Sequence, residues 1–147
     1  MPNAPVPASV DRFLREPHIA VVATLDDEGC PHTAATWYDW EDGRLLLNMD
    51  HSRVRLGHLR RDPRVSVTVV DRQDPYRHIT LSGRVEQLHD DDGLADIDRL
   101  ALRYTGQPYL TRTSPRVSAW VTVESWHGWD ASGARKVTDA SWSDEPA

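Results

Sequence analysis

The sequence predicts a mainly β protein, a small antiparallel β-barrel with a few helices. Short segments rich in β-branched residues recur along the chain, as expected for buried strands. Turn sequences separate several of these segments, and Glu41-Asp42-Gly43 is typical of a tight hairpin turn. With 147 residues the chain is long enough for one domain with a substantial core.

The expected strands are residues 19–25, 33–40, 44–48, 65–70, 76–87 and 116–125. Gly83, inside the fifth of these, indicates a bulge or bend. A short helix is expected over residues 9–15, with Ser9 as its N-cap. A longer amphipathic helix should follow the acidic run 90–92, because Leu94, Ile97, Leu100 and Ala101 recur at helical spacing.

The chain divides into a flexible N-terminal lead over residues 1–8, a barrel domain over residues 9–130 and a polar C-terminal tail over residues 131–147. Trp142 is the one expected anchor of that tail. No stretch approaches the ~20 apolar residues of a membrane span, and the first residues lack the basic and apolar regions of a signal peptide. Cys30 is the only cysteine, which excludes an intrachain disulfide and favours a cytoplasmic location. The histidines show no metal-binding spacing.

Residues 52–66 form the most informative segment, because they concentrate positive charge on an acidic chain. The whole chain has 23 acidic against 17 basic residues and a net charge of -6, yet this segment contains five arginines: Arg53, Arg55, Arg60, Arg61 and Arg64. Ser52 is a good N-cap, and we expect a short helix that ends before Pro63. A helix N-terminus beside arginines suits a phosphate group. The alternative is an ordinary solvated face.

Five sequence blocks occur in an order that resembles the pyridoxamine-phosphate-oxidase-like family, the flavin-binding split barrels. They are residues 36–46 (TWYDWEDGRLL), 58–66 (HLRRDPRVS), 75–76 (PY), 82–85 (SGRV) and 103–106 (RYTG). The similarity covers about residues 8–129 and is greatest to the branch of reductases that use the deazaflavin coenzyme F-420. The resemblance implies a homodimer with cofactor sites in grooves between the subunits. The acidic net charge and the lack of a long apolar stretch predict no nucleic acid or membrane partner.

The resemblance also assigns cofactor-binding residues by position. Arg53 and Arg55 match the basic residues that hold the cofactor phosphate, with Ser52 beside them. Asn48 and Met49 end the strand under the tricyclic ring. Arginine suits this role because its guanidinium group binds phosphate in a bidentate fashion and stays charged.

Two further sets of residues are candidates by the same resemblance. Thr36, Trp37 and Tyr38 belong to the adjoining strand, whose backbone edges the ring. Arg60 and Arg61, together with Arg64, are candidates for the anionic lactyl-polyglutamate tail of F-420, the alternative being that they are solvated.

The function implied is hydride transfer between reduced F-420 and an electron-poor small organic substrate with a conjugated double bond. A tetrapyrrole, a quinone and a xenobiotic are candidate substrates, and the cofactor supplies the chemistry. Two alternatives stay open: an FMN-dependent oxidoreductase of the same fold, and a non-catalytic protein that binds flavin, deazaflavin or haem. No proton donor identifies itself, so solvent, Tyr38 or a histidine are candidates.

Overall fold

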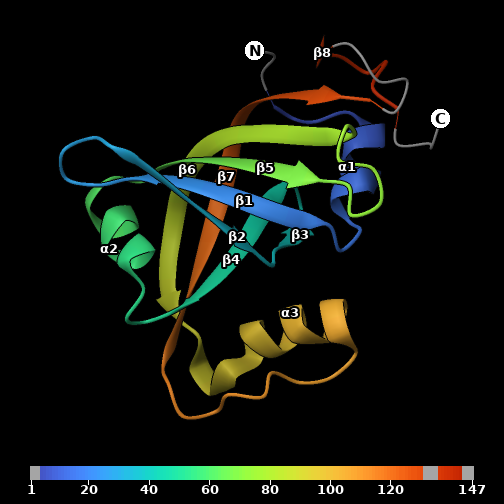
Figure 1. Ribbon diagram of the computed structural model, residues 1–147. Coiled ribbons are helices and arrows are strands. Elements are labelled where there is room, and N and C mark those ends of the chain that lie inside the picture. The colour runs from blue at the N-terminus through green and yellow to red at the C-terminus, as the bar shows by residue number, and fades with distance from the viewer. Residues whose placement is uncertain (1–3, 131–135, 144–147) are drawn as a thin grey trace.

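The computed structural model describes residues 4–130 and 136–143 and contains one curled antiparallel sheet (Figure 1). Its strands are β1 (Ile19–Leu25), β2 (Pro31–Thr36), β3 (Asp39–Glu41), β4 (Arg44–Asp50), β5 (Arg64–Val70), β6 (His78–Asp90), β7 (Arg116–Trp129) and β8 (Lys136–Val137). The helices are α1 (Ala8–Leu14), α2 (Val54–Arg61) and α3 (Ala95–Thr105), the last preceded by a 3-10 turn, η1 (Asp92–Leu94). The predicted mainly β barrel is confirmed.

The strand order is β2-β1-β5-β6-β7-β4-β3, with β8 paired to β7. β2 and β3 follow one another in the chain but lie at opposite ends of this order, so the barrel is split between them. β2 pairs only with β1 among the described strands, and its residues are almost all exposed. The split therefore leaves one long strand edge free beside the barrel interior.

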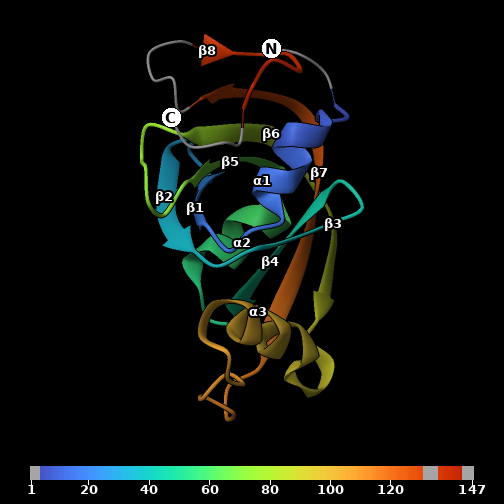
Figure 2. The same ribbon diagram turned by 90° about the vertical axis from the view of Figure 1, so that its right-hand side faces the viewer.

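The core fills the barrel and is closed by a helix at each end. Alternate residues of β1 and β5 are buried, as the period of two in a strand requires. Phe13 and Leu14 of α1 and Leu56 and Leu59 of α2 join this core. Figure 1 shows α1 and α2 at opposite ends of β1, and Figure 2 shows α1 at the end that faces the viewer. None of the described helices is long and apolar enough to cross a membrane.

Two turn and bulge predictions are confirmed by the backbone. Asp42 and Gly43 both have positive φ, 52° and 73°, which is the geometry of a type I′ hairpin turn between β3 and β4. The β6–β7 register shifts between Ser82 and Gly83. A side chain at Gly83 would place its Cβ 2.0 Å from the carbonyl oxygen of Thr122, so only glycine allows this approach of the two strands.

The predicted strand over residues 33–40 is wrong in one respect, since the structure divides it into β2 and β3. The break lies at Trp37 and Tyr38, where the backbone bonds to side chains of α3 in place of a neighbouring strand. The Tyr38 N–H donates to the Tyr104 hydroxyl, and Arg103 Nε donates to the Tyr38 carbonyl. These side chains come from a helix 65 or 66 residues later, which no local pattern reveals.

Helix capping differs from the expectation at α1 and agrees with it at α3. Pro7, and not Ser9, occupies the N-cap of α1, and the buried Ser9 hydroxyl has no hydrogen-bond partner. At α3 the acidic run supplies the cap, because the Asp91 carboxylate accepts the N–H groups of Asp96 and Ile97. Ile97, Leu100 and Ala101 are buried, as their spacing predicts.

The described part of the C-terminal segment packs on the barrel. Trp142 is 1% exposed, and its indole Nε1 donates to the Trp129 carbonyl, so its predicted anchoring role is confirmed. β8 adds a short strand to β7 that the sequence did not predict. Residues 131–135 and 144–147 of the predicted tail lie outside the described residues.

Candidate functional site

A hollow of about 390 Å³ lies where α2, β2 and the end of β4 meet. It contains both backbone and side-chain surfaces from four strands and one helix. Its lining residues are Val22, Thr24, His32, Thr33, Ala34, Ala35, Thr36, Asn48, Met49, Arg53, Val54, Arg55, His58 and Arg116. Five of the ten candidate residues are thus brought together: Thr36, Asn48, Met49, Arg53 and Arg55. The volume lies within the usual range for a small-molecule site.

The start of α2 faces this hollow without a side-chain cap, so the predicted N-cap role of Ser52 is wrong. Asp50 accepts both the backbone N–H and the hydroxyl of Ser52, and it also accepts the Ser114 hydroxyl. These bonds hold the pKa of the Asp50 carboxyl well below its usual range. The helix begins at Val54 and has no acidic residue in its first turn, so its N-terminal positive dipole is not neutralised.

Arg55 carries the clearest sign of a missing ligand. Its Nε is buried and has no hydrogen-bond partner. Burial, and then the nearby charges of Arg53 and Arg116, lowers the pKa of the Arg55 guanidinium. Because a buried charged donor is normally paired, this arrangement fits an absent anionic group such as a phosphate.

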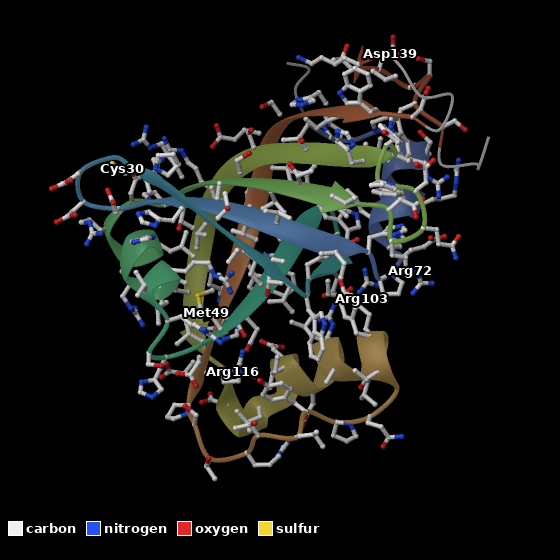
Figure 3. The ribbon with its side chains drawn as sticks, in the orientation of Figure 1. Cys30, Met49, Arg72, Arg103, Arg116 and Asp139 are labelled. Carbon is white, nitrogen blue, oxygen red and sulfur yellow. The ribbon has the colours of Figure 1, made fainter. Side chains whose placement is uncertain are left out.

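Arg116 is a third arginine of the hollow and was missed by the sequence analysis. It lies at the start of β7, far from the arginine segment in sequence, and the β4–β7 pairing brings it opposite Asp50. Its Nε donates to Asn48 Oδ1 at 2.7 Å. Among the described residues, neither Arg53, Arg55 nor Arg116 has a carboxylate within 4.0 Å. Figure 3 shows Arg116 and Met49 on the side of the barrel between α2 and α3.

The side-chain amide of Asn48 forms hydrogen bonds within the protein. Its Nδ2 donates to Asp91 Oδ2 and Ser118 Oγ, while its Oδ1 accepts from Arg116. The amide is buried, with 3% of the residue exposed. Asn48 therefore orients Arg116 at the wall of the hollow.

Two histidines also line the hollow. His58 is buried on α2, and its Nδ1 lies 2.9 Å from the hydroxyl of Thr24. The ring of His32 lies 5.0 Å from that of His58 and pairs with Asp26 at 2.9 Å. These two are the histidines among the residues that line the hollow, so a histidine, which the sequence offers as a proton-donor candidate, lies at this space.

Tyr38 lies in the core and not in the hollow. It is 0% exposed, and its hydroxyl donates to the carbonyl oxygens of Leu14 and Glu16. Burial raises the pKa of the Tyr38 phenol far above its ordinary value. A phenol so placed has no route to a ligand in the α2 hollow.

The other candidates lie around the hollow but outside it. Trp37 lines a second hollow against α3, and Ser52 lines a third beside Arg53. Arg60 lines a separate surface depression with β6, and Arg61 is exposed. Arg64 forms an ion pair with Asp62 at 2.7 Å. The arginine segment thus divides into two residues at the hollow and three away from it.

Comparison with known proteins gives the class of this chain. Residues 6–130 match the family model described as pyridoxamine 5'-phosphate oxidase, which spans most of the chain. The chain belongs to the pyridoxamine 5'-phosphate oxidase family. Its fold is that family's split barrel, and an F420 reductase is among the solved structures that it resembles.

The structural matches give finer detail. An F420 reductase shares 26% sequence identity with a TM-score of 0.76, over 82% of this chain and 98% of that one. A conserved hypothetical protein from Mycobacterium tuberculosis shares 24% identity with a TM-score of 0.65, over 87% and 86% of the two chains. A haem-binding protein from Mycobacterium smegmatis shares 23% identity with a TM-score of 0.62, over 92% and 59%. The last two matches show the fold alone. No curated protein sequence matches the chain.

Proposed function

We propose that this protein is an oxidoreductase that uses coenzyme F-420 and reduces an electron-poor small organic molecule. The observation that carries the proposal is the pair Arg53 and Arg55, which lie unpaired at the uncapped start of α2. A phosphate placed there gains charge-assisted hydrogen bonds and the helix dipole. When bound, the deazaflavin supplies hydride chemistry, and the chain supplies binding and orientation.

Each part of the hollow has a distinct task in this proposal. Arg53 and Arg55 hold the phosphate, and Met49 and Thr36 bound the space for the tricyclic ring. β2 forms one wall, since residues 32–36 all line the hollow. Arg60, Arg61 and Arg64 have no part in the proposal, because they lie away from the hollow.

FMN is the alternative cofactor, favoured by the match to the pyridoxamine 5'-phosphate oxidase family. It shares the tricyclic ring and the ribityl phosphate, so Arg53 and Arg55 suit both molecules. The similarity to an F420 reductase supports the deazaflavin. The two choices separate in one titration, in which quenching of cofactor fluorescence is followed as purified protein is added to F-420 and to FMN.

We expect tighter binding of F-420 than of FMN by at least tenfold, and turnover of reduced F-420 with a quinone acceptor. Equal or tighter FMN binding, or a yellow protein that carries FMN after purification, establishes the FMN alternative. Tight F-420 binding without turnover across a panel of quinones and conjugated enones establishes a carrier protein.

A homodimer is part of the proposal. The free edge of β2 and its exposed residues beside the hollow provide surface for a second copy of the chain. The split-barrel resemblance supports cofactor sites in grooves between the subunits of this dimer. Analytical ultracentrifugation at micromolar concentration tests this point, with a dimer expected and a monomer contradicting it.

A further inference from the structure

A second hollow of about 290 Å³ adjoins the α2 hollow on the side of α3. Its residues are Thr36, Trp37, Asn48, Ile97, Leu100, Tyr109 and Arg116. Thr36, Asn48 and Arg116 line both spaces, so the two hollows meet at these three residues. A molecule in the α3 hollow therefore lies beside whatever fills the α2 hollow.

One side of the α3 hollow is aromatic and apolar, and its rings are held in place. Trp37 stacks on Tyr104 with ring centres 5.3 Å apart and planes 9° apart, and Tyr109 meets Trp37 edge-on at 6.2 Å. The Tyr104 hydroxyl donates to the His18 carbonyl, which holds the stack in place. Ile97 and Leu100 of α3 complete the apolar surface. Such walls favour a planar ring system.

Arg116 is the one charged residue among those that line this hollow. Arg116 lies with its guanidinium 4.9 Å from the centre of the Tyr109 ring, and Asn48 fixes its Nε. Among the described residues its side-chain hydrogen-bond partners are the Asn48 amide and the Tyr109 hydroxyl at 3.5 Å, and both are neutral. A fixed guanidinium with no counter-charge is a receptor for a carboxylate or a similar anion.

We propose that the α3 hollow is the binding site of the electron acceptor, and that the acceptor is a planar, largely apolar molecule with a carboxylate that binds Arg116. This rests on the proposed function, because it takes the α2 hollow as the place of the cofactor. Trp37 and Tyr109 form the aromatic wall against which the ring system of the acceptor lies, and Arg116 sets its orientation. The proposal assigns Trp37 to the acceptor and not to the cofactor.

The test is calorimetric titration of the purified protein with 2-naphthoate as the probe, with and without saturating F-420. We expect 2-naphthoate to bind in both cases, and the neutral ring 2-naphthylmethanol to bind at least tenfold more weakly. The Arg116→Gln variant should lose at least tenfold in affinity for 2-naphthoate, a larger factor than it loses for F-420, because Arg116 lines both hollows. Arg72→Gln removes the same charge from an exposed loop toward the α1 end (Figure 3) and should change neither affinity.

Several outcomes overturn the inference. Displacement of 2-naphthoate by F-420, or an equal loss of 2-naphthoate affinity in Arg55→Ala, places the probe in the α2 hollow. Absence of 2-naphthoate binding while F-420 binds normally refutes the acceptor site and leaves the proposed function intact. A loss of F-420 affinity in Arg116→Gln as large as its loss of 2-naphthoate affinity assigns Arg116 to the cofactor. Thermal unfolding and the Arg116→Lys variant, which keeps the charge, show that any loss belongs to the site and not to misfolding.

Discussion

The two ends of the barrel use their arginines in different ways. Toward α1, Arg103 donates to four backbone carbonyl oxygens, those of Leu14, Arg15, Glu16 and Tyr38. Toward α2, Arg55 buries an Nε that has no partner. Both side chains are partly buried, so exposure does not distinguish them. The difference indicates that Arg103 stabilises the fold, whereas Arg55 is placed to bind a ligand.

The largest expected effect is the loss of stability when Arg103 is replaced by Ala. This change removes the donors that join α3 to the end of α1 and to the break between β2 and β3. We expect the free energy of unfolding to fall by about 2–4 kcal/mol, measured by urea denaturation followed by circular dichroism. Arg103→Lys should recover only a small part of the lost free energy of unfolding, because an ammonium group lacks the planar arrangement of donors of a guanidinium group. A loss below about 1 kcal/mol in Arg103→Ala contradicts this assignment.

Arg55→Ala should show the opposite pattern, with weak binding and a stable fold. Loss of charge-assisted hydrogen bonds worth about 1.5–3 kcal/mol lowers cofactor affinity by about tenfold to 150-fold. Stability should be unchanged or slightly higher, because repulsion from Arg53 and Arg116 is relieved. Arg55→Lys should lose less affinity.

Arg60→Ala is the matched control for Arg55→Ala, since it removes one charge from an exposed position of the same helix. Fluorescence titration of both variants with F-420 or FMN measures the difference. Equal losses in the two variants contradict a direct phosphate contact and indicate only a general effect of positive charge. Arg53→Ala should resemble Arg55→Ala in this assay.

Tyr38→Phe tests whether the α1 end takes part in cofactor binding. The change removes one hydroxyl that donates to the carbonyls of Leu14 and Glu16. We expect a loss of about 1 kcal/mol in the free energy of unfolding and no change in cofactor affinity. A clear loss of affinity at unchanged stability contradicts this expectation and makes the Tyr38 hydroxyl part of the cofactor site.

The smallest effect concerns the pH dependence of stability. Burial lowers the pKa of His18, so the unfolded chain binds a proton more readily than the folded chain does. His18 therefore does not lower the free energy of unfolding at pH values well above its unfolded pKa of about 6.5. The free energy of unfolding declines as the pH falls through that value. His18→Gln should reduce the decline between pH 7.5 and 5.5 in urea denaturation. His51→Gln, at an exposed position, should leave it unchanged.

The sequence predicts those parts of the fold that depend on local chemistry. The β1 strand, the Asp42-Gly43 turn and the bulge at Gly83 all follow from residue types at neighbouring positions. The prediction of the strand over residues 33–40 fails because side chains from α3 take over the backbone bonds of Tyr38. A local sequence pattern does not reveal a hydrogen-bond partner so distant in sequence.

The site shows the same limit. Arg53 and Arg55 were found because they stand in a cluster next to a helix start. Arg116 stands alone after Pro115, and only the pairing of β4 with β7 brings it to the hollow. Ser52 was misassigned as an N-cap because Asp50, two residues earlier, competes for its hydroxyl.

Asp91 joins two parts of the molecule through one carboxylate. Its oxygens accept the N–H groups of Asp96 and Ile97 at the start of α3, and one of them also accepts the amide of Asn48, which holds Arg116. Thermodynamic linkage follows from this shared contact. An anion that fixes Arg116 would thereby favour the folded first turn of α3, and loosening that turn would weaken the anion's binding, with the same coupling free energy in both directions.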